Sequence, residues 1–153
     1  MKTFTLLIFL VALLSIDCPV FCQESSFQWA FECGNPPNST DTKTILTSDI
    51  QDNIIQAGEF LDTAVFKDKS VISAGGTDVF IVKYIAGSDV LWANQIGGVD
   101  YDYIQKIATD QEGNIILVGF FYGTTQIGTD SYTSFGSQDI YIAKFSPDGD
   151  YLW

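Results

Sequence analysis

The sequence repeats itself, and this repeat limits the possible folds more than any other feature of the chain. Moved by 61 positions, residues 41–92 align with residues 102–153 without a gap. Roughly a third of the aligned positions are identical, which chance rarely produces over such a span. Matched pairs include Asp49 with Asp110, Asn53 with Asn114, Gly58 with Gly119, Asp78 with Asp139, Lys83 with Lys144 and Trp92 with Trp153. The chain therefore contains two copies of one structural unit.

Each copy has four segments that we predict to be strands. In the second copy they are residues 102–110, 115–121, 139–145 and a last one that starts at 151. Two short turns rich in Asx and Gly join the first pair and the last pair, as hairpins require. A polar, glycine-rich stretch at 122–138 is predicted to be a long loop, as is its counterpart at 61–77.

The hydrophobic pattern favours a β-propeller. The second and third strands are apolar on successive residues, as is typical of strands buried on both faces. We therefore expect an all-β fold of two four-stranded antiparallel units, stacked as propeller blades in an incomplete ring. A β-sandwich is the alternative, but sandwich strands have no reason to repeat in this way.

The residues of the second copy resemble the bacterial seven-bladed β-propeller repeat, often called the SBBP repeat. That resemblance is carried by Trp92, Gly97, Gly98, Asp102, Ile107, Ala108, Asp110, Gly113, Asn114, Val118, Gly119, Gly123, Thr124, Gly128, Gly136, Asp139, Ala143, Lys144, Phe145, Gly149, Leu152 and Trp153. The first copy departs from it, with Asp52, Glu59 and Lys67 at the places of Gly113, Phe120 and Gly128. The resemblance implies a secreted or cell-surface propeller and no shared chemistry.

The N-terminus is predicted to be a secretory signal peptide, residues 1–22. Lys2 precedes an apolar run at 4–16 that is too short to span a bilayer and is followed by polar residues. An uncleaved anchor and a lipoprotein are the alternatives. We divide the remainder into an outermost-type strand with a Pro-rich loop (23–40), a first blade (41–97) and a second blade truncated at its last strand (98–153). No membrane span is expected in the mature chain.

Two blades cannot close a ring, since a propeller of such units needs roughly four to eight. Three interpretations follow: a fragment of a longer propeller, a ring assembled from several chains, or a small open β protein with exposed edges. Once the signal peptide is removed, Cys33 is the one remaining cysteine, so we expect no internal disulfide. Cys33 aligns with Ile96, which favours a small buried hydrophobe.

The composition excludes several kinds of chemistry. The chain has no His, so Ser/His/Asp and Cys/His catalysis and the usual zinc sites are ruled out. Its net charge is −12 and it has no Arg, which argues against nucleic-acid binding. Two acidic pairs, Asp100 with Asp102 and Asp148 with Asp150, do not match a calcium loop. We expect no catalytic residue, no metal and no cofactor.

The recurring acidic residues have a structural interpretation, since Asp side chains cap backbone N–H groups in tight turns. This applies to Asp49 with Asp110 and to Asp78 with Asp139, which fall at equal places in each copy. The repeated tryptophans are likewise expected to pack.

The candidate binding residues are aromatic and lie in or beside loops expected on one propeller face: Tyr101, Tyr103, Tyr122 and Tyr132. Aromatic rings near amides and carboxylates suit sugar or peptide recognition, although they could equally fill gaps between blades. Asn38 starts a glycosylation sequon that would be used only in a eukaryotic host.

We therefore expect a secreted or cell-surface protein with a binding or scaffolding role and no catalytic activity. Its partner is an unknown protein or glycan, and further blades are supplied in cis or in trans. The alternative is a lectin-like ring that binds carbohydrate and is assembled from several two-blade chains.

Overall fold

The computed structural model describes residues 43–85 and 89–153, and within them the chain is built from strands. The predictions for residues 1–22 and 23–40, including Cys33 and Asn38, lie outside the described residues. The strands are β1 (Thr44–Ser48), β2 (Ile54–Phe60), β3 (Thr63–Phe66), β4 (Lys69–Ile72), β5 (Asp78–Tyr84), β6 (Val90–Gly98), β7 (Asp102–Thr109), β8 (Ile115–Phe121), β9 (Thr124–Ile127), β10 (Asp130–Thr133) and β11 (Asp139–Phe145). In the described part of the chain, no helix is long and apolar enough to cross a membrane.

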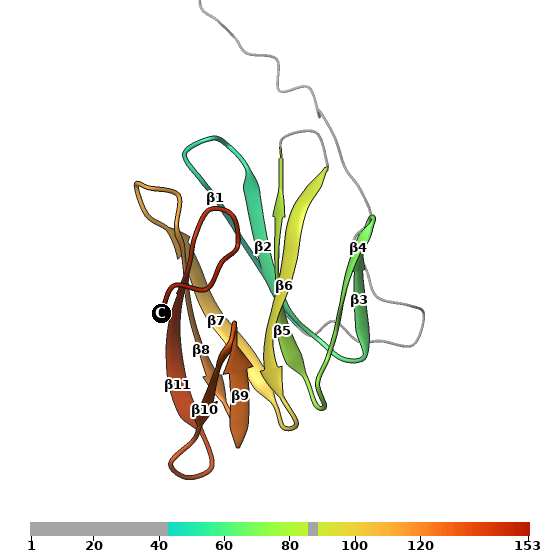
Figure 1. The fold of residues 1–153 in the computed structure, drawn as a ribbon, viewed down its shortest axis with the longest axis vertical. Helices are drawn as coiled ribbons and strands as arrows, with labels where there is room; N and C mark the ends of the chain where they lie inside the picture. Colours follow the sequence, from blue (N-terminus) through green and yellow to red (C-terminus); the bar gives the residue numbers. More distant parts are fainter. Residues whose placement is uncertain (1–42, 86–88) are drawn as a thin grey trace, which may run out of the picture.

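The two copies of the repeat form two antiparallel sheets with the same local order. In the first copy, β1, β2, β5 and β6 are neighbours in that sequence. In the second copy, β7, β8 and β11 repeat the order of β1, β2 and β5, and Tyr151 forms a bridge with Phe145 at the outer edge. Figure 1 shows the two sets of strands side by side. An all-β antiparallel fold is therefore confirmed.

The turns between the first two strands of each copy are equivalent at the level of single atoms. Asp49 Oδ1 accepts hydrogen bonds from the Gln51 and Asn53 backbone amides at 2.9 and 3.0 Å. Asp110 Oδ1 accepts the matching bonds from Glu112 and Asn114 at 3.0 and 2.9 Å. The expected capping role of both aspartates is confirmed.

The first of these turns uses a residue that is poorly suited to its backbone conformation. Gly113 has a φ of 80°, and its counterpart Asp52 has a φ of 61°. Glycine adopts this left-handed region without a steric penalty, whereas a non-glycine residue there is uncommon, with Asp among the more tolerant.

The segments 61–77 and 122–138 are not the loops that the sequence indicated, because each contains a β-hairpin. Strands β3 and β4 pair in the first copy, and β9 and β10 pair in the second. Both hairpins turn through a left-handed residue, Lys67 (φ 57°) or Gly128 (φ 61°). Thr, Tyr, Val and Phe in these segments have high β propensity, which outweighed the polar and glycine-rich composition.

The two hairpins occupy different places. Strand β9 pairs with β6, with Ile127 opposite Ile96 and Thr125 opposite Gly98, so the hairpin of the second copy extends the sheet of the first to six strands. Strands β3 and β4 instead form a separate two-stranded sheet. The Phe66 ring of β3 packs 4.8 Å from the ring of Phe80, which places this hairpin over one face of the first sheet.

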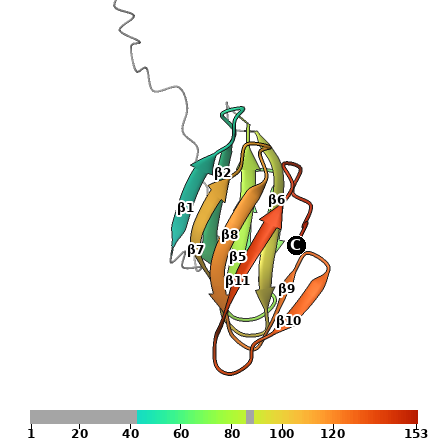
Figure 2. The same cartoon turned by 90° about the vertical axis from the view of Figure 1, so that its left-hand side faces the viewer.

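The main core lies between the sheets of the two copies. Residues of the first copy meet residues of β7, β8 and β11, and the cluster includes Ile55, Val79, Ile81, Ile96, Ile104, Ile115, Leu117 and Phe145. Figure 2 is seen from the side of the second copy, with its strands over those of the first. A second cluster fills the other face of the first sheet, beneath the β3–β4 hairpin. Strand β5 is therefore buried on both faces, as predicted, whereas the same prediction is wrong for its counterpart β11, which is exposed on one face.

Candidate functional surfaces

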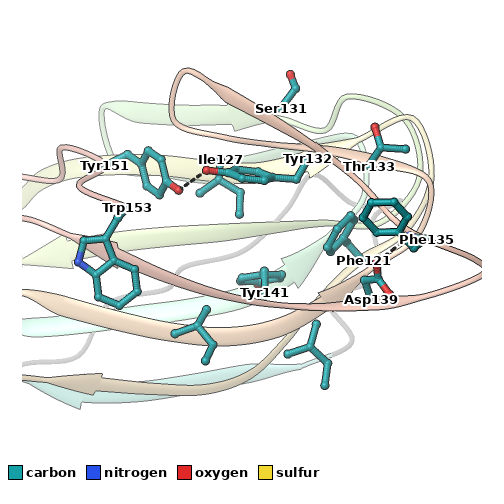
Figure 3. A pocket seen from close by; sticks show the side chains of 12 residues that line it. Phe121, Ile127, Ser131, Tyr132, Thr133, Phe135, Asp139, Tyr141, Tyr151 and Trp153 are labelled. Carbon is teal, nitrogen blue, oxygen red and sulfur yellow. Dashed lines mark hydrogen bonds between the residues drawn. The ribbon is translucent and has the colours of Figure 1, made fainter.

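An open groove of about 740 Å³ lies between the β9–β10 hairpin and β11. It is lined by Tyr132, Phe135, Tyr141, Tyr151 and Trp153, and by isoleucines of β11. Figure 3 shows the Tyr132 and Tyr151 side chains meeting at one side of it, where their hydroxyl oxygens are 2.7 Å apart. Burial and this contact raise the pKa of Tyr151 to about 12.

The side of β11 opposite Tyr141 carries an apolar face whose counterpart in the first copy is covered. Ile140 and Ile142 are 75% and 57% exposed, whereas their equivalents Val79 and Ile81 are fully buried. The first copy presents Val79 and Ile81 to the second copy, which covers them. The face of β8 and β11 that carries Ile140 and Ile142 is called here the front face of the second copy. The front face is thus equivalent to the surface of the first copy that the second copy covers.

Three of the four candidate tyrosines form one cluster. The rings of Tyr101 and Tyr103 are nearly parallel, with centroids 6.4 Å apart and an interplanar angle of 12°. Tyr122 meets Tyr103 edge-on at 6.3 Å, and Phe120 lies 4.9 Å from Tyr103. Tyr132 does not belong to this cluster, because it lies on the groove with Tyr151.

The cluster extends from an exposed loop to the edge of the front face. Tyr101 is 53% exposed, in the connection between β6 and β7. Phe120 is opposite Tyr103 in the sheet, and its counterpart in the first copy, Glu59, is buried against the Ile104 amide of the second copy. Phe120 therefore stands at the place that Glu59 occupies at the contact between the copies, and Tyr101 is the exposed member of the cluster.

At the opposite end of the strands, lysines neutralise the turn aspartates. Lys83 Nζ lies 2.9 Å from Asp49 Oδ2, and both side chains are almost completely buried. Burial alone would raise the pKa of Asp49, but hydrogen bonds from Asn53 and Lys83 lower it to about 2. The matching pair, Lys144 with Asp110, has the same distance but is partly exposed. Hydrogen bonds from Asn114 and Lys144 lower the pKa of Asp110.

The contact between the copies also contains two acidic side chains that have no positive partner among residues 43–85 and 89–153. Asp78 and Asp102 are fully buried, and one oxygen of each accepts a backbone hydrogen bond: from Ala74 to Asp78 (2.8 Å) and from Gly98 to Asp102 (2.9 Å). Within the described residues, the second oxygens of Asp78 and Asp102 make no hydrogen bond. Burial raises the pKa of Asp102, although the Thr125 hydroxyl is close enough to oppose part of that rise. Burial raises the pKa of Asp78 to about 7, and the nearby Asp102 adds to this effect.

Sequence reasoning had treated Asp78 as a turn cap and had set Asp102 aside as half of an unconvincing calcium pair. The capping bond of Asp78 is present and is repeated by Asp139, which accepts from the Phe135 amide at 2.7 Å. The signal for burial was the surrounding sequence, since Asp78 precedes the apolar run at 79–82 and Gly97 leaves room for the Asp78 carboxyl group. Within the described residues, no three His, Cys, Asp or Glu side chains come together in a way that could hold a metal ion.

Comparison with known proteins shows what part of the repeat is similar to. Residues 91–119, from β6 to β8, match a family described as the beta-propeller repeat, SBBP. The chain is also 30% identical over 135 residues to an uncharacterized WD repeat-containing protein of Acanthamoeba polyphaga mimivirus. That match covers 74% of this chain and 10% of the viral protein, so the chain spans a small part of its relative.

Proposed function

We propose that the chain is part of a secreted or cell-surface propeller with a binding or scaffolding role and no catalytic activity, because residues 91–119 match the beta-propeller repeat SBBP. Its two repeat units act as neighbouring blades. Further blades come from the same polypeptide or from other chains and pack on the front face of the second copy.

The observation that supports this proposal most strongly is the difference between equivalent isoleucines. Ile81 is fully buried under the second copy, whereas Ile142 is 57% exposed at the same place in the second copy. Exposed isoleucine, phenylalanine and tryptophan around the groove form an apolar surface of the kind that marks an interaction site. The repeat itself shows that such a surface can be covered by another unit.

Light scattering after size-exclusion chromatography tests the supply of blades by other chains. We expect a discrete oligomer for the unmodified chain and a monomer for Ile142→Lys, because a buried lysine without a partner would destabilise the contact. Val99→Lys is the control, since Val99 is 80% exposed in a connecting loop. An unmodified chain that stays monomeric at high concentration would contradict assembly in trans and would leave the supply of blades to the same polypeptide.

A second candidate function is carbohydrate binding by an assembled ring. It is favoured by the tyrosine cluster, since Tyr101 is half exposed and is held nearly parallel to Tyr103. Aromatic faces of this kind pack against the apolar faces of sugar rings. A glycan array is expected to show saturable binding that is lost in Tyr101→Ala. Phe135→Ala is the matched control, because it also removes a highly exposed ring, and it should keep the binding. Equal loss in both variants would refute recognition by the cluster.

A further inference from the structure

The junction between the two copies contains an uncompensated acidic pair. Asp78 starts β5 of the first copy, and Asp102 starts β7 of the second. Both lie against consecutive glycines of β6: a Cβ on Gly97 would overlap the Asp78 carboxyl group, and the Gly98 amide donates to Asp102. Thr125, from the hairpin that extends the first sheet, is opposite Gly98. Elements of both copies therefore enclose the pair.

No cation in the described part of the chain compensates the pair. Burial raises the pKa of Asp102, hydrogen bonds from Thr125 and Gly98 lower it in part, and the charged neighbour Asp100 raises it further. Burial also raises the pKa of Tyr141, and the negative charges of Asp102 and Glu59 add to this effect. Tyr103, on β7, is likewise within reach of Glu59. Four of the lysines are engaged in ion pairs elsewhere, and Lys43 donates to the Ile104 carbonyl oxygen.

Two buried carboxylates without a counterion cannot both stay ionised at little cost. Removing one carboxylate from water is unfavourable, and a second negative charge nearby increases the penalty. A proton on one of them removes a charge and supplies a donor for an oxygen that otherwise has no partner. The unpartnered oxygens of Asp78 and Asp102 are therefore explained if the junction binds a proton.

We propose that Asp78 and Asp102 make the junction between the two repeat units a proton-linked lock, which holds while the pair carries a proton and loosens when both carboxyls ionise. The sign follows from linkage. The pKa of Asp78 is about 7 in the folded chain and is 3.8 for an unperturbed carboxyl, so the folded state binds more protons between these values. Stability must therefore fall as the pH rises from about 4 to about 7.

The composition of the chain makes this pH window unusually clear. The sequence has no His, so no histidine titrates between pH 5 and 7. Asp49 has a lowered pKa of about 2, and its contribution to stability changes only in more acidic solution. The α-amino group, with a usual pKa of about 7.7–8.0, is the same in every variant.

The test is urea unfolding of the chain at half-unit steps from pH 5 to 7.5, for the unmodified protein, Asp78→Asn and Asp139→Asn. Asp139 is the matched control, because it makes the same backbone hydrogen bond at the equivalent place but is not fully buried. For the unmodified chain and the control, we expect the unfolding equilibrium constant to rise by up to about tenfold per pH unit. Asp78→Asn should clearly weaken this dependence and leave the smaller part that comes from the buried Asp102 carboxyl.

A flat or opposite dependence in the unmodified chain would overturn the proposal, as would an unchanged slope in Asp78→Asn. If Asp78→Asn fails to fold, Asp102→Asn is measured in its place and should weaken the pH dependence of unfolding relative to the unmodified chain. Hydrogen exchange of the Ile104 amide, which faces Glu59 across the junction at 3.4 Å, should lose protection as the pH rises, after correction for intrinsic rates. Calcium chloride added at pH 7.5 should have no effect. Restoration of stability by calcium would show that a metal ion, and not a proton, neutralises the pair.

Discussion

Replacement of Ile81 and of Ile142 by alanine compares one side chain in two environments. Ile81 is fully buried between the two copies, whereas its repeat equivalent Ile142 is 57% exposed. Each change removes three carbon atoms, worth about 0.8 kcal/mol each when fully buried. For Ile81 the transfer cost is therefore about 2.4 kcal/mol, and the cavity left behind should bring the total to about 3–4 kcal/mol. For Ile142, less than half of that surface is buried and no closed cavity forms, so we expect about 1 kcal/mol or less.

The assay is equilibrium unfolding in urea, followed by tryptophan fluorescence. Trp92 is a suitable reporter, because its indole N–H donates to the Pro147 carbonyl oxygen of the other copy at 3.1 Å. The slope of the transition should be similar in both variants, since neither change alters the surface exposed on unfolding by much.

Equal losses for Ile81→Ala and Ile142→Ala in a monomeric sample would refute the argument, since they would mean that the front face is already covered. A loss for Ile142→Ala that grows with protein concentration would instead indicate that another molecule covers this face.

Three further predictions follow from contacts described above. Lys83→Met leaves the buried Asp49 carboxylate without its partner and should cost about 3–5 kcal/mol, whereas Lys144→Met should cost clearly less because that pair is partly exposed; paired urea titrations would show this, and equal costs would contradict it. Gly98→Ala should disrupt the pairing of β6 with β9, because a Cβ would overlap the Thr124 carbonyl oxygen; the expected readout is faster amide exchange at Thr125, and unchanged exchange would argue against the close approach. In acid, the stability supplied by Asp49 should be present above pH 3.8 and disappear towards pH 2, so the unfolding midpoint should drop over this range in the unmodified chain and less in Asp49→Asn.

The repeat made the order of the main strands predictable. The turn residues Asp49 and Asp110 accept equivalent hydrogen bonds, so at these places a match in sequence was a match in structure. Burial on both faces of β5 was also correct, because a continuous apolar run leaves no polar side for water.

The hairpins and the acidic pair were harder to predict for physical reasons. The segment that contains β9 and β10 has short strands with mostly exposed side chains, so it carries no hydrophobic alternation to detect. Asp78 satisfies a turn with one oxygen, and only the three-dimensional arrangement shows that the other oxygen is buried beside Asp102. Likewise, the four tyrosines looked equivalent as loop residues, yet Tyr132 faces a different surface from Tyr101.

The pairing of β9 with β6 also makes the contact between the two repeat units asymmetric. The second unit completes the sheet of the first through its β9–β10 hairpin, so the second unit, deleted as a block, would take with it a piece of the first unit's sheet. A break in the connection between Gly98 and Asp102 would therefore not release two independent modules, since three backbone partners and the shared core would still join them. In repeat proteins, stability depends on such nearest-neighbour interfaces. Here the interface includes backbone pairing between β6 and β9. Duplication or loss of a whole unit should therefore be tolerated only when the unit boundary is moved so that the β9–β10 hairpin stays with the sheet it extends.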